Sequence, residues 1–469
     1  MSVSRTLNIA QSGLQVYQEA LDVTSNNISN SSNPNYSRQQ VNLKSAIPTS
    51  SGSTIWGNGV TLADIQRVRD NLTDGQIITN NSAYSYNNQL SNELGDVQSL
   101  FNEPSTDNTS GTTSVSNSTD SLSNSTSAFF TAWQNLAVTP NSVSLRNNVI
   151  QAAQGLSNNI TTINEGIATV KSNTSTALDG DLTTLNSDLQ QIQSLNVQIT
   201  ASEAAGQTPN DLMDTRQGLI NSVSNLADVN VTYSSTGAAV LSIAGTVAVD
   251  QNTYNQFSAT EVNGNLTINN ANSSSPVNLS GGGTIGAELD TYNNYIPEYQ
   301  TSLNNYVNRL MTSVNSLHET GYSITNPTQS GTDFFSSYAD GTLTINPALV
   351  NDPNQIAISS DGTSGNGNVA TSIANLQNQQ DSSGTTLTDD YASLVSKIGT
   401  DTQNATNQAD NYNTLLTSLN NQESSYSGVS LDQEMTNVIQ YQRSYQACAE
   451  VITTASAMLE TLITMMGGS

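Results

Sequence analysis

Both ends of the chain carry apolar residues at seven-residue spacing, and this feature limits the possible fold more than any other. Near the N-terminus one line of the repeat is Leu7, Leu14, Leu21 and Ile28, and the complementary line is Val3, Ala10 and Tyr17. Near the C-terminus the two lines are Leu431, Val438, Tyr445, Ile452, Leu459 and Met466, and Met435, Gln442, Ala449, Ser456 and Ile463. A heptad pattern predicts helices with one narrow apolar face that needs a partner. We therefore expect the two ends to pack together or against neighbouring chains.

The interior is predicted to mix helices with short strands. Helical stripes are expected within Phe129–Leu136, Val149–Ile167, Leu178–Ile199, Tyr292–Leu317 and Leu394–Leu419. Alternation punctuated by glycine predicts hairpins in Val229–Asp250, with short strands at Leu266–Ile268 and Gly341–Ile345. The Ser/Thr/Asn-rich segment Pro104–Asp120 is expected to be a flexible loop.

The charge balance excludes some partners. Of the 469 residues, 11 are Lys or Arg and 38 are Asp or Glu, which gives a formal net charge of -27. A nucleic-acid binder needs clustered cations, and an anionic membrane surface would repel this chain, so we expect neither partner.

A single cysteine, Cys448, excludes an internal disulfide framework and is expected to be a small buried side chain. The start MSVSRTLNIAQSGLQ lacks the apolar run of a Sec-type signal peptide, so we expect any export to use another route.

No candidate for catalysis or ligand binding is supported by its surroundings. Gly281, Gly283 and Gly286 match a dinucleotide-binding spacing, but the preceding strand and the later acidic residue are weak or missing, so a flexible entry to a helix is expected. Asp179 and Asp181 lack the remaining ligands of a calcium loop.

Asp211 and Asp214 are expected to stabilise a helix N-terminus. His318 is the chain's only histidine and is expected to be structural or exposed to solvent. We therefore predict no enzymatic activity, no cofactor and no metal.

A polar segment follows the N-terminal stripe. Three N-x-[ST] triplets begin at Asn27, Asn30 and Asn35, and we interpret them as a by-product of an Asn- and Ser-rich composition. Asn26, Asn27 and Asn30 are expected to end the helix by satisfying its last carbonyl groups or by adopting positive φ. Pro34 and Asn35 predict a type II turn that directs Tyr36 into an extended segment.

The segment around this turn, AQSGLQVYQEALDVTSNNISNSSNPNYSRQQVNL, resembles the signature of bacterial flagellar rod, hook and hook-associated proteins. The matching positions are Asn26, Asn27, Ile28, Ser29, Asn30, Pro34, Tyr36, Ser37 and Arg38, whereas Asn35 stands where the family usually has Gly. Four further stretches resemble the members that join the hook to the filament: SLFNEPS, FFTAWQNLAVTPNSVSLRNNVIQAAQGL, PNDLMDTRQGLI and GVSLDQEMTNVIQYQRSYQACAEVITTASAMLETLI.

The resemblance implies a fold and a function. The expected fold is mainly α with smaller β parts: a multidomain, elongated axial protein with a helical coiled-coil domain formed by both chain ends and a mixed α/β middle domain. The implied function is a structural component of the extracellular flagellum that joins hook to filament by self-assembly after export through the flagellar type III secretion channel. The implied partners are other copies in a ring or helical assembly, hook protein, a second junction protein or filament, the distal cap, and a cytoplasmic export chaperone at the C-terminal region. The alternatives are another axial protein of the hook, rod or filament, or a secreted adhesin.

The expected domain organisation follows the same resemblance. Residues 1–60 form the N-terminal helix and extended turn of the terminal domain, and 428–469 form its C-terminal helix. Within the middle domain, 61–228 are helical, 229–285 are β-rich, 286–322 form a long helix and 391–427 form the return helix. Residues 323–390 form a short mixed segment after Phe334 and Phe335, where larger family members insert an outer domain, so that domain is expected to be reduced or absent. The assembly interface is expected on the terminal heptad lines, and the signature turn comprises Asn26, Asn27, Asn30, Pro34, Asn35 and Tyr36.

Overall fold

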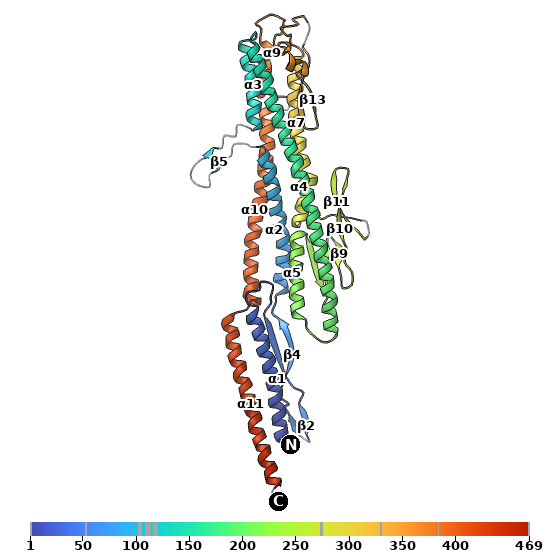
Figure 1. Ribbon diagram of the computed structural model, residues 1–469, viewed down its shortest axis with the longest axis vertical. Helices are drawn as coiled ribbons and strands as arrows, with labels where there is room; N and C mark the ends of the chain where they lie inside the picture. The colour runs from blue at the N-terminus through green and yellow to red at the C-terminus, as the bar shows by residue number, and fades with distance from the viewer. Residues whose placement is uncertain are drawn as a thin grey trace.

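The computed structural model describes residues 2–51, 54–101, 106–107, 114–115, 121–272, 275–328, 331–382 and 384–467. They form a long rod in which helices run along the axis and small sheets lie beside them (Figure 1). The predicted mainly helical, elongated class with several domains is confirmed. The predicted flexible loop at Pro104–Asp120 lies outside the described residues, except for the short strands β5 (Thr106–Asp107) and β6 (Ser114–Val115).

Both chain ends lie at one end of the rod, where α1 (Ser2–Ser29) and α11 (Leu431–Gly467) run side by side in opposite directions (Figure 1). Strands β1 (Gln39–Ser45) and β4 (Val60–Arg67) form an antiparallel hairpin that packs along α1. Between these strands, β2 (Thr49–Ser51) pairs with β3 (Thr54–Trp56) to form an arm. We call α1, α11 and these four strands the terminal module.

Three long helices build the rod beyond the terminal module: α2 (Asn71–Leu100), α4 (Val143–Ala204) and α10 (Leu387–Ser427). Each begins where a polar side chain accepts a hydrogen bond from a free backbone N–H group, which fixes the first turn. The capping side chains are Asp70 for α2, Ser142 for α4 and Thr386 for α10. Helix α3 (Leu122–Val138) precedes α4, and the chain breaks between them around Pro140. At 62 residues α4 spans about 90 Å, so it sets much of the length of the rod.

A β-rich part lies beside α4 and α5 (Asn210–Leu226). Its two antiparallel sheets are β7 (Val229–Tyr233), β8 (Ala239–Ile243) and β9 (Thr246–Val249), and β10 (Phe257–Val262), β11 (Asn265–Asn270) and β12 (Ser275–Val277). The chain then continues as one helical run through α6 (Gly283–Asp290), the π-helical segment η1 (Thr291–Tyr295) and α7 (Ile296–His318).

The expected flexible entry to this helical run is wrong. Gly283 is the first residue of α6 and has φ of +67°. A Cβ atom there would lie 2.2 Å from the backbone carbon of Leu226, so glycine permits a close backbone contact between α6 and the end of α5.

The end of the rod distant from the termini holds a compact aromatic core. Here the chain forms β13 (Phe335–Ala339), β14 (Thr342–Ile345), α8 (Pro347–Asn351), η2 (Pro353–Gln355), α9 (Asn368–Asn375) and η3 (Leu376–Asn378). Phe129, Trp133, Phe334 and Phe335 are buried against one another, with ring centroids 4.9–6.3 Å apart among the contacting pairs. The segment after Phe335 therefore continues as a short hairpin packed on the rod.

The interior stripes pack as predicted. The six stripe residues Leu178, Leu182, Leu185, Leu189, Ile192 and Ile199 are all buried, as are most apolar residues from Tyr292 to Leu310. The strands expected at Leu266–Ile268 and Gly341–Ile345 are part of β11 and β14, and Val229–Asp250 forms a three-stranded sheet.

Candidate assembly interface

The seam between α1 and α11 is narrow because small side chains lie at its centre. A Cβ atom on Gly13 would lie 2.8 Å from Sγ of Cys448, so the two helices approach closely there. The rings of Tyr17 and Tyr441 meet one turn further along, with centroids 6.3 Å apart. These two contacts set the alignment of the antiparallel pair.

On α11, one predicted heptad line is half-buried except for Leu431, which is 50% exposed, and the other is exposed except for the half-buried Ala449. Val438, Tyr445, Ile452 and Leu459 are half-buried, as expected for seam positions. The second seam line is Glu434, Tyr441, Cys448 and Ala455, which is shifted by one residue from the expected line Met435, Gln442, Ala449, Ser456 and Ile463. Glu434 and Cys448 are not typical seam residues. A choice of seam positions by apolarity alone therefore selected the adjacent residues Met435 and Ala449 in their place. The expected line lies beside the seam, with Met435 and Ile463 exposed, and its contact with other chains stays a prediction. The side chain of Met466 lies outside the described residues.

Helix α1 is covered on two sides. Val3, Leu7, Leu14, Tyr17, Leu21 and Ile28 are half-buried and Ala10 is buried. Val16, Ala20, Thr24 and Asn27 are also buried. The heptad analysis did not select Val16, Ala20 or Asn27. The hairpin adds this second contact, since a Cβ atom on Gly59 would lie 2.5 Å from the Ser12 hydroxyl oxygen.

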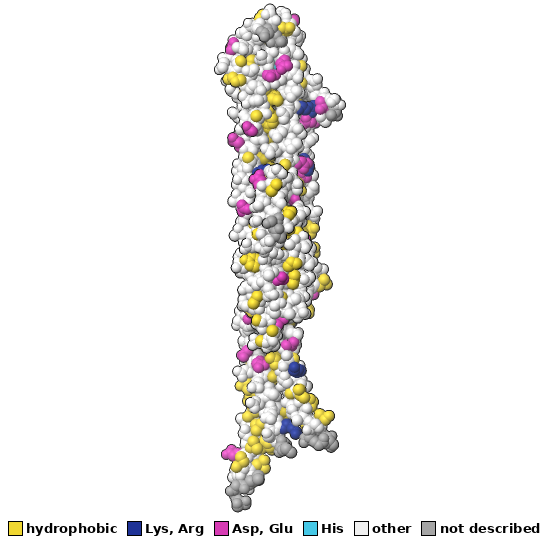
Figure 2. Space-filling model, turned by 90° about the vertical axis from the view of Figure 1, so that its right-hand side faces the viewer, with side chains coloured by type: hydrophobic (Ala, Val, Ile, Leu, Met, Phe, Trp, Pro, Cys, Tyr) yellow, Lys and Arg dark blue, Asp and Glu magenta, His cyan; other side chains and the backbone are white. Residues whose placement is uncertain are grey.

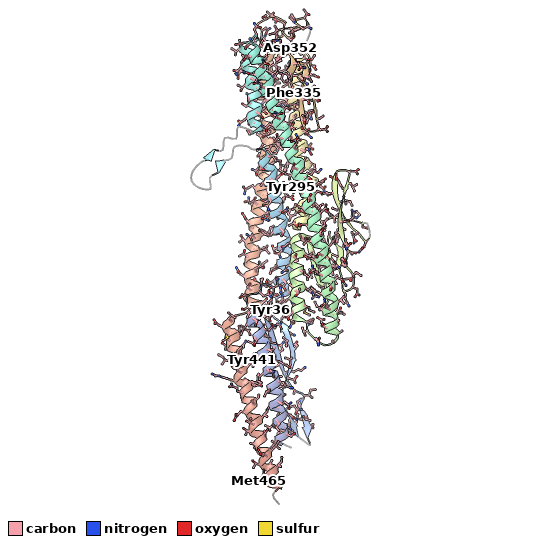
Figure 3. The ribbon with its side chains drawn as sticks, viewed as in Figure 1. Tyr36, Tyr295, Phe335, Asp352, Tyr441 and Met465 are labelled. Carbon is pink, nitrogen blue, oxygen red and sulfur yellow. The ribbon has the colours of Figure 1, made fainter. Side chains whose placement is uncertain are left out.

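Helix α11 leaves many apolar side chains uncovered. Among its described residues, the exposed large ones are Leu431, Met435, Ile439, Val451, Met458, Leu462, Ile463 and Met465. Figure 2 shows apolar side chains gathered on the surface towards the end with both termini, and Figure 3 places Tyr441 and Met465 along this helix.

One stretch within Leu387–Met465 is long and apolar enough to cross a membrane by length and composition alone, and little of it is buried. The expectation of no membrane partner stays a prediction.

The signature turn joins the terminal module to the rod. Asn30 donates from its side chain to the Asn26 carbonyl oxygen at 3.0 Å, which satisfies one helix-terminal carbonyl as predicted. Asn27 instead receives a hydrogen bond from the Tyr36 hydroxyl at 2.8 Å and pairs with the backbone of Gln39 at 2.9 Å in both directions. Asn27 is 1% exposed, so its amide serves the backbone of β1 and not a glycan.

The predicted type II turn is wrong. The Tyr36 N–H group donates to the Asn33 carbonyl oxygen at 3.1 Å across Pro34 and Asn35, so a turn is present. Asn35 does not have the positive φ that a type II turn requires at this position. Its N–H group instead donates to the Asn33 side chain at 3.1 Å, which fixes the turn without a left-handed residue.

A buried polar network holds the chain where it passes between the two parts; we call it the joint. Asp214 of α5 accepts from the Ser37 N–H group at 2.9 Å, the Ser37 hydroxyl at 2.7 Å and Arg67 at 2.8 Å. Arg69 contacts Asp74 of α2 through two hydrogen bonds of 2.6 and 2.9 Å, and Glu423 of α10 at 2.9 Å. Hydrogen bonds to charged groups in such a site are each worth about 1.5–3 kcal/mol.

The joint corrects the interpretation of Asp211 and Asp214 as helix-stabilising residues. Asp211 does lie in the first turn of α5, but its side chain accepts from Gln39 at 2.9 Å. Asp214 binds two segments that precede it by about 150 residues or more. Spacing within one helix could not reveal such partners. Burial, with Asp211 and Asp214 next in effect, raises the pKa of Tyr36, so its hydroxyl stays protonated as the donor to Asn27.

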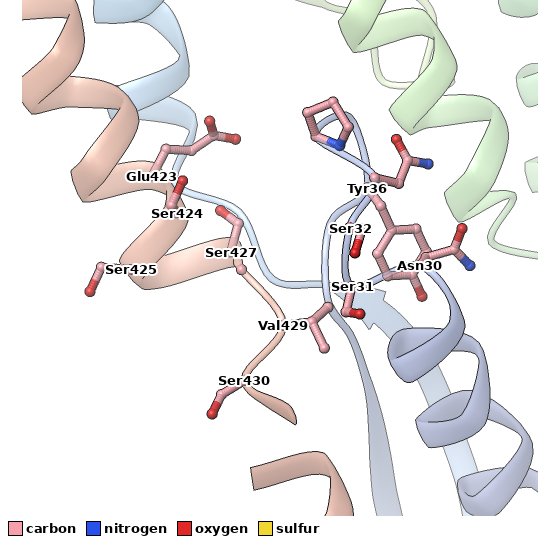
Figure 4. Close-up of a pocket in the computed structure, with 13 residues that line it drawn as sticks. Asn30, Ser31, Ser32, Tyr36, Glu423, Ser424, Ser425, Ser427, Val429 and Ser430 are labelled. Carbon is pink, nitrogen blue, oxygen red and sulfur yellow. The ribbon is translucent and has the colours of Figure 1, made fainter. Parts of the chain in front are cut away.

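An open polar cleft of about 510 Å³ lies beside the joint (Figure 4). The turn supplies Asn30, Ser31, Ser32 and Tyr36 to one wall; the end of α10 supplies Glu423, Ser424 and Ser427 to the other, with Val429 from the link to α11. The backbone N–H group of Arg38 donates to the Ser427 carbonyl oxygen at 2.9 Å and ties the two walls together. Among the described residues no group of three or more His, Cys, Asp or Glu side chains could hold a metal ion.

Three family models match the chain in the parts that meet at the joint. Residues 7–36 match the flagella basal body rod protein model, 112–335 match the helical domain of flagellar hook-associated protein FlgK, and 422–465 match the C-terminal model of flagellar basal body rod FlgEFG protein. The flagellar hook-associated protein 1 of Bacillus subtilis is 28% identical over 98% of this chain and 98% of its own length. The protein of the same name from Escherichia coli is 24% identical over 98% of this chain and 100% of its own length. The chain is thus similar to flagellar hook-associated protein 1 over nearly its whole length.

A solved structure supports the family fold. The flagellar hook junction protein FlgK from Burkholderia pseudomallei superposes with a TM-score of 0.62 and 14% identity, over 75% of this chain and 100% of that chain. Asp214 and Glu423 of the joint lie in two of the matched segments, and Ser37 directly follows the third. The joint therefore lies where parts matched by different family models come together.

Proposed function

We propose that this chain is a structural subunit of the bacterial flagellum that joins the hook to the filament. It acts in the extracellular flagellum, as its similarity to flagellar hook-associated protein 1 over nearly the whole chain indicates. The observation that carries the proposal is the contrast within the molecule: the rod buries its large apolar side chains in its cores, while the described part of α11 exposes eight of them. Such a face is stable in water only when neighbouring subunits cover it.

The partners follow from this role. The chain assembles with hook and filament proteins, and side by side with its own copies in a ring or helical array beneath the distal cap. Before export through the flagellar type III channel, a cytoplasmic chaperone covers the C-terminal region. The exposed apolar face of α11 supports that assignment, because it needs cover before assembly as well as after it. A chain with one cysteine also carries no internal disulfide that would oppose passage through a narrow channel.

We also propose that the chain has no enzymatic activity and binds no cofactor. His318 is buried, and its Nε2 atom accepts from the Ala357 N–H group at 3.0 Å while Nδ1 faces the Thr332 carbonyl oxygen. Both ring nitrogens are thus engaged in structure. Cys448 lies in the α1–α11 seam against Gly13. These contacts favour structural roles for both residues.

The domain division stays part of the proposal. We assign 1–60 and 428–469 to the terminal domain and the remainder to the middle domain, with 323–390 as a reduced outer segment; the pairing of β4 with β1 extends the terminal part to Arg67. The joint lies close to these boundaries, since Ser37, Arg69 and Glu423 all contribute to it.

Deletion of the gene tests the function. The expected result is cells that retain hooks, lack filaments and shed filament protein into the medium, as seen by electron microscopy and by analysis of the culture supernatant. Intact swimming filaments in the deletion strain would refute the junction role. Complementation with Met435→Asp should fail to restore filaments, while Leu72→Asp, at an exposed residue of α2, should restore them.

A further inference from the structure

Two exposed apolar patches lie on different elements of the terminal module. The arm patch is formed by Ile47, Ile55 and Trp56 beside and within β2 and β3, where Ile47 is 86% and Ile55 is 75% exposed. The flank patch is formed by Val451, Met458 and Met465 of α11, which follow one another at seven-residue spacing beside the seam line of Cys448 and Ala455. Helix α1 lies between the hairpin and α11, so one chain cannot bring its own two patches together (Figure 1).

The two patches lie at the same height along the rod. The Arg5 guanidinium lies 4.9 Å from the centroid of the Trp56 ring, which fixes the arm beside the first turns of α1. Gly13 faces Cys448 across the seam, and the helices are antiparallel. Counting eight residues along each helix from this contact places Arg5 of α1 level with Ser456 of α11. Ser456 lies between Val451 and Met458 in the sequence. Two copies standing side by side without an axial shift therefore bring an arm patch to a flank patch.

The charges beside the patches are complementary. Arg5 and Lys44 lie beside or within the hairpin, in a chain that has only 11 Lys and Arg residues. Glu450 and Glu460 are exposed on α11, the element that carries the flank patch. Opposite charges on the two elements favour this pairing and disfavour contact of like patches. A lipid surface would meet the acidic residues of α11 as well as its apolar ones, so the charges favour a protein occupant.

We propose that the arm patch of one copy docks on the flank patch of the next copy in the assembly. This inference rests on the proposed function and names the surface through which its subunits touch. The contact is head-to-tail, because two different patches meet, and repetition of such a contact yields a closed ring or a continuing helix. The sequence pattern did not reveal the arm, because three short apolar positions in a polar segment show no periodicity.

Disulfide cross-linking in isolated flagella tests the contact. A chain with Ile55→Cys and Met458→Cys should form dimers and higher oligomers of this chain on mild oxidation. Each single variant should stay monomeric; both retain Cys448, which is half-buried in the seam. A second pair, Ile47→Cys with Met465→Cys, should give the same ladder. Absence of the ladder in both pairs, dimers from a single variant, or cross-links only to a chain of another mass would overturn the inference.

A second measurement separates this inference from the proposed function. Ile55→Asp should cause loss of filaments and shedding of filament protein, while Leu72→Asp should not. Suppose that the gene deletion removes filaments, that Ile55→Asp leaves them attached and that neither cysteine pair cross-links. The proposed function is then supported and the arm contact is refuted. If the deletion leaves swimming filaments, the proposed function itself is refuted.

Discussion

The rod and the terminal module are both built from long helices, yet they place their apolar side chains differently. In the rod, large side chains such as Trp133, Phe334 and Leu185 are fully buried. In the described part of α11, Ala455 is the one buried apolar side chain, while eight large ones are exposed. The two tyrosines and small residues of the seam hold α1 and α11 together without closing a core. We infer that the rod completes its fold within one chain and that the terminal module completes its fold in the assembly.

The largest expected effect separates the two regions by stability. Phe334→Ala should lower the free energy of unfolding of the isolated chain by about 3–5 kcal/mol, because it leaves a cavity in the aromatic core. Met465→Ala, at a residue that is 74% exposed, should change it by less than about 0.5 kcal/mol. Denaturant unfolding of both variants measures the contrast. Equal losses in the two variants would show that α11 is already packed in the monomer.

The next effect concerns the connection between the two regions. Asp214→Ala leaves Arg67 and the Ser37 N–H group without their partner, and loss of one member of a buried pair costs about 3 kcal/mol. Hydrogen exchange should then rise at residues 36–39 and at the start of α5, with little change at the aromatic end of the rod. Asp211→Ala, which removes one exposed hydrogen bond to Gln39, is the matched control and should have a small effect. Unchanged exchange near residue 37 in Asp214→Ala would refute the role of the joint.

Acid should weaken the rod through its single histidine. Burial lowers the pKa of His318 to about 4, from 6.5 in an exposed histidine. The unfolded chain therefore binds a proton at higher pH than the folded chain, so the stabilisation is complete above pH 6.5 and is lost as the pH falls towards 4. The loss is about 3 kcal/mol. Unfolding measured between pH 7 and 5 should show this decline, and His318→Gln should show a shallower one. Parallel curves for the two chains would contradict it.

The sequence was sufficient where periodicity decides the structure and insufficient where distant segments meet. Seven-residue spacing located α1 and α11, and the stripe from Leu178 to Ile199 is buried as a helix face should be. The same spacing chose Met435 where Glu434 faces the seam, because a heptad leaves two neighbouring lines to choose from. The joint could not be predicted, because Ser37 and Asp214 are separated by 177 positions and neither residue carries a local signal of its partner. Motif resemblance supplied the function, which the physical pattern alone did not specify.

A buried carboxyl group should make the rod less stable at high pH. Burial, and then the charges of Asp181 and Glu93, raises the pKa of Glu288 to about 9, from 4.5 in an exposed glutamate. The unfolded chain loses this proton near pH 4.5 while the folded chain retains it, so stability falls as the pH rises between these values. Glu288→Gln keeps the shape and cannot ionise, so it should be more stable than the natural chain at pH 8–9 and similar to it near pH 4.5. Unfolding curves at both pH values test this, and a gain that does not depend on pH would contradict it.

The smallest expected effect tests whether the seam of the terminal module is packed tightly at one point. Gly13→Ala places a methyl group 2.8 Å from Sγ of Cys448, which is closer than two such atoms can stand, so α1 and α11 must separate slightly. Overpacking of this kind costs about 1 kcal/mol. Cys448→Ala removes the obstructing sulfur, so the double variant should recover the loss, and hydrogen exchange in α1 and α11 reports it. If Gly13→Ala has the same effect with and without Cys448, the two residues do not meet in solution, and the α1–α11 pair must then form only in the assembly.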